Sequence, residues 1–410
     1  MHQDDPRIVI LGGGQAGSSA AAFLRQFGWR GAILLLGEES VAPYQRPPLS
    51  KAWLKGEADA ASLALRPAEF YAKQGITLQL ATRVAAIDRA ARRLRLDDGG
   101  AVAYDHLILA TGARPRRLAL PGHDLAGVLE LRTAADADRL QAALRPGVRL
   151  AVIGGGYIGL EVAASARALG VEVVVVEREA RALARVASPM LSEFVASHHR
   201  AHGVALELDA TVEALEGGAG RVRGVRLTDG RLIGCDVALV GIGAVPNDGL
   251  ARAAGLECAD GIVVDLASGT SDPAIHAIGD CTHRPLPLYG RSGRLESVPN
   301  AIEQARQAAS ALCGRAPPPP EVPWFWSDQF DLRLQLAGLA FDACETILRG
   351  DAAAPGFAVF HLAADGVLQA VEAVNAAPEF MAGRLLIGRR QRVARERLAD
   401  PLLSMHDVAA

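Results

Sequence analysis

The sequence predicts an α/β protein with two Rossmann-like dinucleotide-binding domains followed by a C-terminal α+β domain. Two glycine fingerprints, Gly12–Gly17 and Gly154–Gly159, carry this prediction. Each follows a short apolar run typical of a buried parallel strand, and each precedes a helical pattern. The third domain is indicated by four consecutive prolines, Pro317–Pro320, which predict a stiff linker before a segment of different composition.

The first fingerprint belongs to a βαβ unit with a strand over Ile8–Leu11, a helix over Ala16–Phe27 and a strand over Ala32–Leu36. In such a unit the three glycines allow a tight turn, a close approach to a pyrophosphate, and close packing of helix on strand. The phosphates then lie on free amides at the helix N-terminus. Glu38, just after the second strand, is placed to accept both hydroxyls of an adenosine ribose. Glu39 could substitute for it, and a surface acid is the alternative interpretation.

Three prolines prevent a helix at the start of residues 43–51, and a helix is expected from about Leu49. Short strands are expected next, the last of which ends abruptly at Ala110-Thr-Gly112, as if the chain leaves one domain there. These strands are 78–80, 93–96, 101–103 and one that begins at His106 and stops at the glycine and proline of Gly112-Ala-Arg-Pro115.

The second βαβ unit has a strand over Leu150–Ile153, a helix over Tyr157–Leu169 ended by Gly170, and a strand over Glu172–Glu177. Glu177 at the strand end is expected to bind the ribose diol of NADH and to repel the 2′-phosphate of NADPH.

Two arginines, Arg178 and Arg181, follow Glu177. Because arginines bind the 2′-phosphate of NADPH, this cofactor stays open as the alternative to NADH.

Strands at 205–208, 222–227 and 232–240 are expected next. A strand at 274–279 ends on Gly279-Asp280, as if the chain returns to the first domain, and a helix over 296–312 opens at Pro299. The third domain is expected to hold a hairpin of 357–362 and 367–374, then a helix at 378–387.

Composition excludes several classes of function. A net charge of −3 gives no electrostatic reason to expect nucleic acid binding. The polar start and the lack of a long apolar run predict a cytoplasmic protein without a membrane span. The five cysteines are scattered without metal-ligand spacing and predict small buried hydrophobes, so no metal site is expected.

In order, the motifs of the whole chain resemble one family. It is the FAD-dependent NADH:ferredoxin reductases of bacterial oxygenase systems, the putidaredoxin reductase and biphenyl dioxygenase ferredoxin reductase type, on a glutathione-reductase-like fold. The motifs are the two fingerprints, Arg46-Pro-Pro-Leu-Ser-Lys51, Ala110-Thr-Gly112, Gly279-Asp280, Ser297-Val-Pro-Asn-Ala301 and Trp324-Phe-Trp-Ser-Asp-Gln329.

This resemblance implies FAD in the first site and NADH in the second. It also implies that Lys51 and Glu161 pair beside the reactive edge of the flavin, and that the helix near Pro299 directs its dipole at the flavin pyrimidine. The FAD residues are then Gly12, Gly14, Gln15, Ala16, Gly17, Glu38, Arg46, Pro47, Lys51, Ala110, Thr111, Gly112, Arg132, Asp280, Val298 and Trp326. The NADH residues are Gly154, Gly156, Tyr157, Ile158, Glu161, Glu177, Gly241, Ile242 and Gly243.

We expect a discontinuous FAD-binding domain, an NADH-binding domain and a C-terminal interface domain. Their boundaries are 1–114 with 246–316, 115–245, and 321–410. Residues 40–52 hold no cysteine. The thiol relay of related disulfide reductases is therefore excluded, and electrons must leave the flavin directly.

The resemblance implies a 2Fe-2S ferredoxin as electron acceptor, which would feed a haem monooxygenase or a ring-hydroxylating dioxygenase. Arg66 and Arg306 match basic positions of similar proteins and are candidates for its dock, whereas the arginine-rich run 389–397 is expected to be a solvated helix face. Two alternatives stay open. One is a rubredoxin reductase. The other is an apoptosis-inducing-factor-like NADH sensor, whose long third-domain insertion and basic surface this chain lacks.

Overall fold

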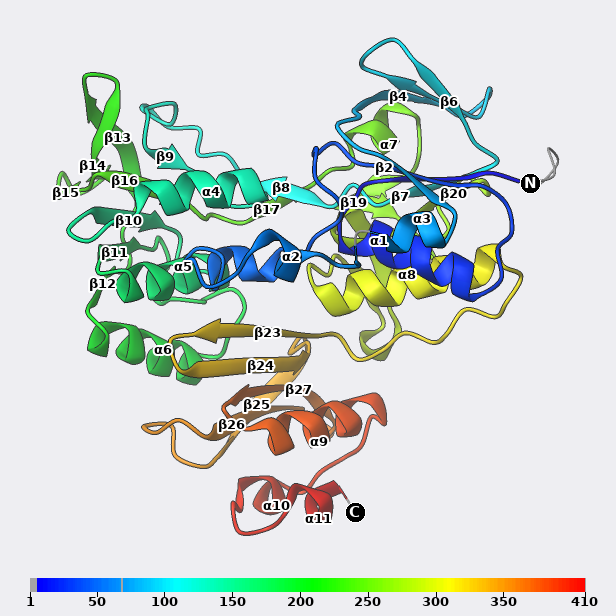
Figure 1. Cartoon of the computed structure of the whole chain (residues 1–410). Helices are drawn as coiled ribbons and strands as arrows, with labels where there is room; N and C mark the ends of the chain where they lie inside the picture. The colour runs from blue at the N-terminus through cyan, green and yellow to red at the C-terminus, as the bar shows by residue number, and fades with distance from the viewer. Residues whose placement is uncertain (1–5, 68, 410) are drawn as a thin grey trace. The chain divides into compact units, whose positions relative to one another are not determined.

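The computed structural model describes residues 6–67 and 69–409, and the polar start that entered the localisation prediction lies outside them. The chain divides into two compact units (Figure 1). Unit 1 consists of Met1–Gln45, Ala60–Arg114 and Val245–Phe325, and unit 2 of Arg46–Asp59, Pro115–Ala244 and Trp326–Ala410.

Unit 1 is built on a parallel sheet of order β20-β7-β1-β2-β3, in which β1 lies between β2 and β7. The strands are β1 (Ile8–Leu11), β2 (Ile33–Leu36), β3 (Ile76–Gln79), β7 (His106–Leu109) and β20 (Ile275–Ala277). Every residue of β1 is buried, as a strand covered on both faces must be. Helices α1 (Gln15–Gln26) and α8 (Val298–Leu312) pack side by side (Figure 1), and small alanines of both helices enter the core.

Smaller elements complete unit 1. One antiparallel sheet holds β4 (Val84–Asp88), β5 (Arg93–Leu96) and β6 (Ala101–Ala103). A second sheet holds β18 (Cys258–Ala259), β19 (Gly261–Val263), β21 (Thr282–Leu286) and β22 (Arg291–Gly293). The short helices are α2 (Ala60–Leu63), α3 (Phe70–Lys73), α7 (Gly249–Ala253), η2 (Gly279–Cys281) and η3 (Pro287–Tyr289).

Unit 2 contains a second parallel sheet, of order β12-β11-β10-β16-β9. Its strands are β9 (Val128–Leu129), β10 (Arg149–Ile153), β11 (Glu172–Val176), β12 (Val204–Glu207) and β16 (Val237–Val240). The helices of this part are α4 (Ala134–Ala143), α5 (Tyr157–Ala168) and α6 (Pro189–Ala201). A small antiparallel sheet is formed by β13 (Val212–Gly218), β14 (Arg221–Leu227) and β15 (Leu232–Gly234).

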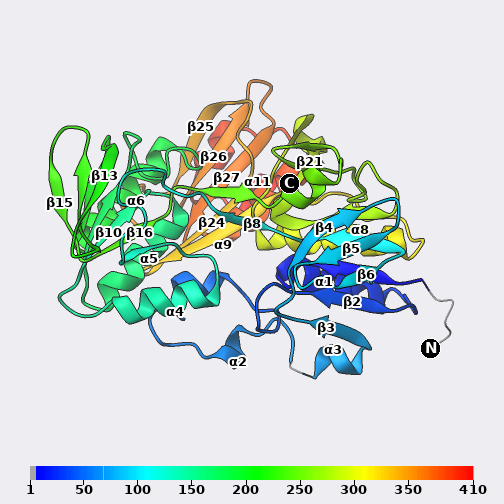
Figure 2. The same ribbon diagram turned by 90° about the horizontal axis from the view of Figure 1, so that it is seen from above.

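The last part of unit 2 is an antiparallel sheet of order β23-β24-β27-β26-β25. Its strands are β23 (Trp324–Gln329), β24 (Leu332–Gly338), β25 (Ala343–Arg349), β26 (Phe357–Ala363) and β27 (Leu368–Val374). Helix α9 (Ala377–Gly388) packs against β24 and β27 (Figure 1, Figure 2), and the short helices α10 (Arg395–Ala399) and α11 (Met405–Ala409) follow. Two parallel Rossmann-like sheets and a C-terminal antiparallel sheet with helices confirm the predicted fold class.

Two short strands carry the chain from one unit to the other, β8 (Ala113–Pro115) and β17 (Ala244–Pro246). Within the described residues no helix is both long enough and apolar enough to span a bilayer.

Three local predictions are wrong. Instead of an α-helix near Leu49, the chain forms the 3₁₀ helix η1 (Pro47–Ser50) and then turns, because Pro47 and Pro48 have no N–H to donate and Leu49 bonds back to Arg46. The single strand expected over 232–240 is two strands, β15 and β16, in different sheets. The run 389–397 is not one helix face. It covers the end of α9, a turn in which Arg390 has a φ of 51°, and the start of α10.

Candidate functional site

The first glycine turn of unit 1 is shaped by close backbone contacts. Gly12 follows β1 with a φ of +123°, and a Cβ built on it would lie 2.1 Å from the carbonyl oxygen of Ala110. A Cβ on Gly17 would lie 2.0 Å from the carbonyl oxygen of Gly12. No side chain fits at either position, so both glycines are required by the packing of β1, β7 and α1 themselves.

Gly14 differs from these two glycines because it faces open space. No described atom lies within 4 Å of a Cβ built on it. It is the N-cap of α1, where no side chain caps the helix and no acidic residue stands in the first turn. In contrast, Thr133, Ser188 and Ser297 cap α4, α6 and α8 with their hydroxyls. The amides of Gln15 and Ala16 at the start of α1 therefore fit the pyrophosphate of a dinucleotide.

Other predicted FAD residues of unit 1 lie at the same carboxyl edge of its parallel sheet. Ala110, Thr111 and Gly112 follow β7, and Asp280 follows the neighbouring β20. A Cβ on Gly279 would lie 3.1 Å from the Cβ of Ala16 and 3.9 Å from that of Ala301, so this turn reaches both α1 and α8. Val298 is the first residue of α8. Glu38 follows β2 with its side chain mostly exposed, 3.6 Å from Arg83.

Unit 2 repeats the open glycine turn. A Cβ on Gly154 would lie 2.4 Å from the carbonyl oxygen of Gly241, whereas Gly156 has no described atom within 4 Å of its built Cβ. Gly156 is the N-cap of α5, again without a capping side chain or a first-turn acid. Tyr157 and the exposed Ile158 open this helix, and Gly241, Ile242 and Gly243 follow β16 beside β10. This turn fits a second dinucleotide in the same way.

Glu177, at the end of β11, turns its carboxylate back to the second glycine turn. One carboxylate oxygen accepts the amide N–H of Gly155 at 2.6 Å, and the other accepts the amide N–H of Glu179 at 2.9 Å. A carboxylate at this place lies where the adenosine ribose of a nicotinamide dinucleotide binds in Rossmann-like sites.

Lys51 and Glu161 are brought together, although they are far apart in the sequence. Lys51 follows η1, and its Nζ lies 2.6 Å from Oε2 of Glu161 on α5. The Lys51 side chain is 19% exposed and the Glu161 side chain 6%. Lys51 also donates to the carbonyl oxygen of Pro47 at 3.0 Å. The pair is therefore partly buried and fixed in position by the proline loop.

Two serines that sequence reasoning missed complete the surroundings of Glu161. Ser50 donates to Oε2 at 2.5 Å, and Ser327 on β23 donates to Oε1 at 2.7 Å. Gln329 donates to Ser327 at 3.1 Å and contacts the buried His199 at 2.8 Å. Lys51, Ser50 and Ser327 therefore give the buried carboxylate of Glu161 three hydrogen-bond donors. Ser50 and Ser327 lie within the quoted motifs, but nothing in the pattern singles them out.

The remaining predicted FAD residues also belong to unit 2. The guanidinium of Arg46 donates to the carbonyl oxygen of Arg132 at 2.5 Å, which ties the start of η1 to the segment before α4. Pro47 is the first residue of η1, and Trp326 is a half-buried residue of β23.

All five cysteines lie within the described residues and are free thiols. Burial raises the pKa of Cys235 to about 11 and also raises the pKa of Cys258, Cys281 and Cys313. These four thiols stay protonated near neutral pH, and a protonated thiol is a poor nucleophile. No disulfide joins any of the five described cysteines.

We therefore expect that changing all five cysteines to serine leaves the reduction of bound flavin by NADH intact in the protein that folds. Cys235 and Cys281 are fully buried, so the variant should unfold at a lower temperature because hydroxyls replace apolar sulfur in the core. Anaerobic bleaching of the flavin absorbance by NADH measures the first effect. If NADH fails to bleach the folded, flavin-loaded variant, a thiol takes part in flavin reduction and this expectation is wrong.

Comparison with known proteins agrees with this geometry. The family model "Pyridine nucleotide-disulphide oxidoreductase" matches residues 6–305, and the model "Reductase C-terminal" matches residues 324–409. A probable ferredoxin reductase, CtmF of Castellaniella defragrans, is 54% identical over 404 residues, which is 98% of both chains. The rubredoxin-NAD(+) reductase of Pseudomonas putida is 43% identical over 335 residues, 82% of this chain and 87% of that one.

A solved structure of the covalent putidaredoxin reductase–putidaredoxin complex is also similar. Its TM-score is 0.96 at 42% sequence identity, with 98% of each chain covered. The family and these relatives imply that the chain uses FAD and NAD(H), and the two open glycine turns fit two such dinucleotides. The chain therefore belongs to the pyridine nucleotide-disulphide oxidoreductase family, and within it to the flavoprotein reductases that resemble putidaredoxin reductase.

Proposed function

We propose that this protein is an NADH-dependent ferredoxin reductase that holds one FAD and passes electrons singly to a 2Fe-2S ferredoxin of an oxygenase system. The observation that carries the proposal is the pair of open, uncapped glycine turns at Gly14 and Gly156, in a chain that has no cysteine in residues 40–52. Two dinucleotides without a disulfide relay imply transfer from nicotinamide to flavin and then directly to a partner.

When bound, FAD supplies an acceptor for two electrons that can also give them up one at a time. The first turn of α1 would hold its pyrophosphate, and Glu38 and Asp280 would hold its sugar hydroxyls. Lys51 would contribute positive charge at the reactive edge of the ring, where charge develops during hydride transfer. Glu161 would supply the counter-charge of Lys51, and Ser50 and Ser327 would hold Glu161 in place.

The domain boundaries proposed for these tasks are 1–114 with 246–316 for FAD, 115–245 for NADH and 321–410 for the interface domain. The NADH site would use the first turn of α5, Glu177, and the loop 241–243 after β16.

The proposed preference for NADH depends on which arginines near Glu177 are available. Arg181 donates to the carbonyl oxygens of Ala184 and Ala187 and to the hydroxyl of Ser192, so its guanidinium is occupied within its own loop. Arg178 is exposed and lies 2.8 Å from Glu179. Of these two arginines, Arg178 is therefore the one left to attract a 2′-phosphate, and the carboxylates of Glu177 and Glu179 oppose it.

We expect the wild type to use NADH at least roughly tenfold more efficiently than NADPH in kcat/KM. Glu177→Ala should narrow this ratio, because it removes both the acceptor for the ribose diol and the repulsion of the phosphate. Steady-state kinetics with both nucleotides measure the ratio. A wild type that prefers NADPH would show that Arg178 decides the choice and would contradict the role proposed for Glu177.

The proposed dock for the acidic ferredoxin is a set of arginines that lie over phenylalanine rings of unit 1. Arg66 lies 5.2 Å from the ring centre of Phe70, and Arg306 lies 5.4 Å from that of Phe23. Arg315, which the sequence analysis did not select, lies 4.9 Å from that of Phe27, and the rings of Phe23 and Phe27 stack on each other. Rings that hold the guanidinium groups in place reduce the entropy lost when a partner binds.

Arg66→Glu and Arg306→Glu should each slow electron transfer to ferredoxin while leaving reduction of the flavin by NADH unchanged. Steering between opposite charges acts over about one Debye length, ~10 Å at 0.1 M salt, so the same step should slow as salt is added. Stopped-flow traces of the two half-reactions measure both effects. Arg95→Glu on β5, an exposed arginine of the β4-β5-β6 sheet, is the control with the same change in charge.

If Arg66→Glu and Arg306→Glu reduce ferredoxin at the same rate as Arg95→Glu in low salt, the dock lies elsewhere. Rubredoxin is the second candidate partner, because the chain is 43% identical to a rubredoxin-NAD(+) reductase. Faster reduction of rubredoxin than of any 2Fe-2S ferredoxin would favour that function.

A further inference from the structure

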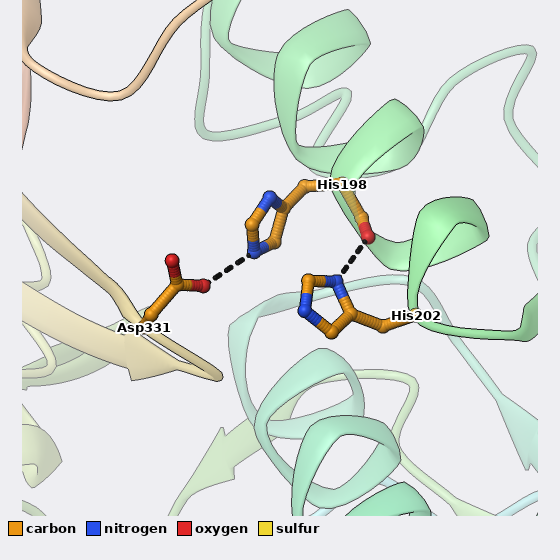
Figure 3. A group of neighbouring side chains, drawn as sticks. All are labelled: His198, His202 and Asp331. Atoms are coloured by element: carbon orange, nitrogen blue, oxygen red, sulfur yellow. Dashed lines mark hydrogen bonds and ion pairs between the residues drawn. The ribbon is translucent and has the colours of Figure 1, made fainter.

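A histidine pair on α6 and an aspartate of the last sheet meet at the surface of unit 2. His198 lies in the last turn of α6, and His202 is the residue that ends this helix. Asp331 lies in the turn between β23 and β24. Residues four apart on a helix lie on the same face, so the two imidazoles are neighbours, and Asp331 approaches them from the hairpin (Figure 3). We call these three residues the His198–His202–Asp331 cluster.

The ligand atoms of the cluster converge. One atom from each residue lies within 4.8 Å of the other two, and Nε2 of His198 is 2.7 Å from Oδ1 of Asp331. Nδ1 of His202 lies 2.8 Å from the carbonyl oxygen of His198, which accepts a hydrogen bond from it. This bond fixes the tautomer that leaves a lone pair on Nε2 of His202, and Figure 3 shows that nitrogen on the side of the ring facing Asp331. A metal-bound histidine commonly has such a backbone bond on its other nitrogen.

The rings are held in position by aromatic neighbours. His202 stacks on Phe330, with ring centres 4.2 Å apart and an angle of 21° between the planes. The centres of the His198 and His202 rings are 4.4 Å apart. On the adjoining face of α6, the buried His199 contacts Gln329 at the end of β23, which fixes the hairpin turn against the helix. The two imidazole rings are therefore held in position before any ion binds.

A purely structural role does not account for the whole cluster. The contact of His198 with Asp331 is enough to link α6 to the hairpin, and it does not use Nε2 of His202. Two imidazole nitrogens and one carboxylate oxygen are a donor set that Zn²⁺ prefers, and three protein ligands leave one position for water. The side chain of Asp331 is 68% exposed and free to shift slightly. Such a shift would separate Oδ1 of Asp331 from Nε2 of His198 enough for both atoms to bind one ion.

We propose that the His198–His202–Asp331 cluster is a surface binding site for Zn²⁺ or a similar divalent transition-metal ion, which would fasten the end of α6 to the β23–β24 hairpin. The spacing of the cysteines predicts no metal site, and the cluster contains no cysteine. This proposal is independent of the ferredoxin reductase function, because the cluster shares no residue with the residues assigned to FAD or NADH.

The test is a calorimetric titration of the FAD-loaded, untagged protein with zinc chloride after treatment with a chelator and its removal. Cys344→Ser serves as the background, because it removes the exposed thiol that could bind zinc. We expect one ion per chain and a raised unfolding temperature with zinc, since an ion that binds only the folded state stabilises it. His202→Asn and Asp331→Asn should each weaken binding at least about tenfold.

His123→Asn is the matched control. His123 is also exposed and also contacts a carbonyl oxygen through Nδ1, that of Leu120 at 3.1 Å, but it belongs to no such cluster of described residues. Its variant should bind zinc like the background protein. The proposal is overturned if the background protein binds no stoichiometric zinc, or if His202→Asn and Asp331→Asn bind as tightly as His123→Asn.

Discussion

Gly14→Val should yield a folded but colourless protein. Gly14 has an extended backbone, with φ −86° and ψ −165°, which valine adopts readily. Apart from its chain neighbours, no described atom lies within 4 Å of a Cβ built on it, so the side chain would extend into open space at the start of α1. If that space holds the pyrophosphate, bound FAD should fall below about a tenth of the wild-type content. Absorbance after purification measures FAD, and circular dichroism checks that the protein has folded.

Gly156→Val is the matched variant for the second turn. Gly156 also has an extended backbone and open space in front of its Cβ position. We expect this variant to stay yellow and to be reduced by dithionite but not by NADH. Gly12→Val is less informative, because its Cβ would collide with the backbone of Ala110 and disturb the turn itself. Full FAD content in Gly14→Val would contradict the assignment of the first turn.

Glu161→Gln should slow the reduction of FAD by NADH at least about tenfold while FAD remains bound. Glutamine has the same shape and can still accept from Lys51, but it carries no charge. Without the charge of Glu161, the partly buried Lys51 has no counter-ion and is held less firmly beside α5. Stopped-flow traces of flavin reduction by NADH measure this effect.

Ser327→Ala is the milder comparison, because it removes one donor to Glu161 and keeps both charges. It should slow flavin reduction less than Glu161→Gln does. Lys51→Met tests whether the pair acts as a unit. If it does, Lys51→Met combined with Glu161→Gln should be no slower than Lys51→Met alone. Wild-type rates in Glu161→Gln would contradict the role given to this pair.

The features that the sequence predicts best are local ones. The two βαβ units combine a glycine fingerprint with adjacent apolar strands, and both appear in the structure within one or two residues of the expected bounds. The same local reasoning failed at Leu49. There the consecutive prolines favour a 3₁₀ turn. Its hydrogen bonds, from Leu49 to Arg46 and from Lys51 to Pro48, cannot be predicted from any periodic pattern in the sequence. The break between β15 and β16 was missed because each strand joins a different sheet, which depends on distant partners.

The candidate sites show the same division. Ser327 is 166 residues from Glu161 in the chain, and Asp331 is 133 residues from His198. No periodicity links such residues, so only the fold brings them together. The pairing of Lys51 with Glu161 was expected from the family resemblance alone. In contrast, Gly12 and Gly14 belong to the same sequence motif. Only the structure shows that Gly12 is needed for packing and that Gly14 faces open space.

The central claim is that electrons enter from NADH and leave singly to an iron–sulfur partner without a thiol step. The most direct test is an anaerobic titration in which the FAD-loaded protein and an excess of oxidised 2Fe-2S ferredoxin receive measured amounts of NADH. We predict that each NADH reduces two ferredoxins, since a hydride carries two electrons and each cluster accepts one, and that a thiol-alkylating reagent leaves this ratio and the rate unchanged. A flavin that NADH does not bleach, a ferredoxin that stays oxidised while the flavin is reduced, or inhibition by the reagent would contradict the claim.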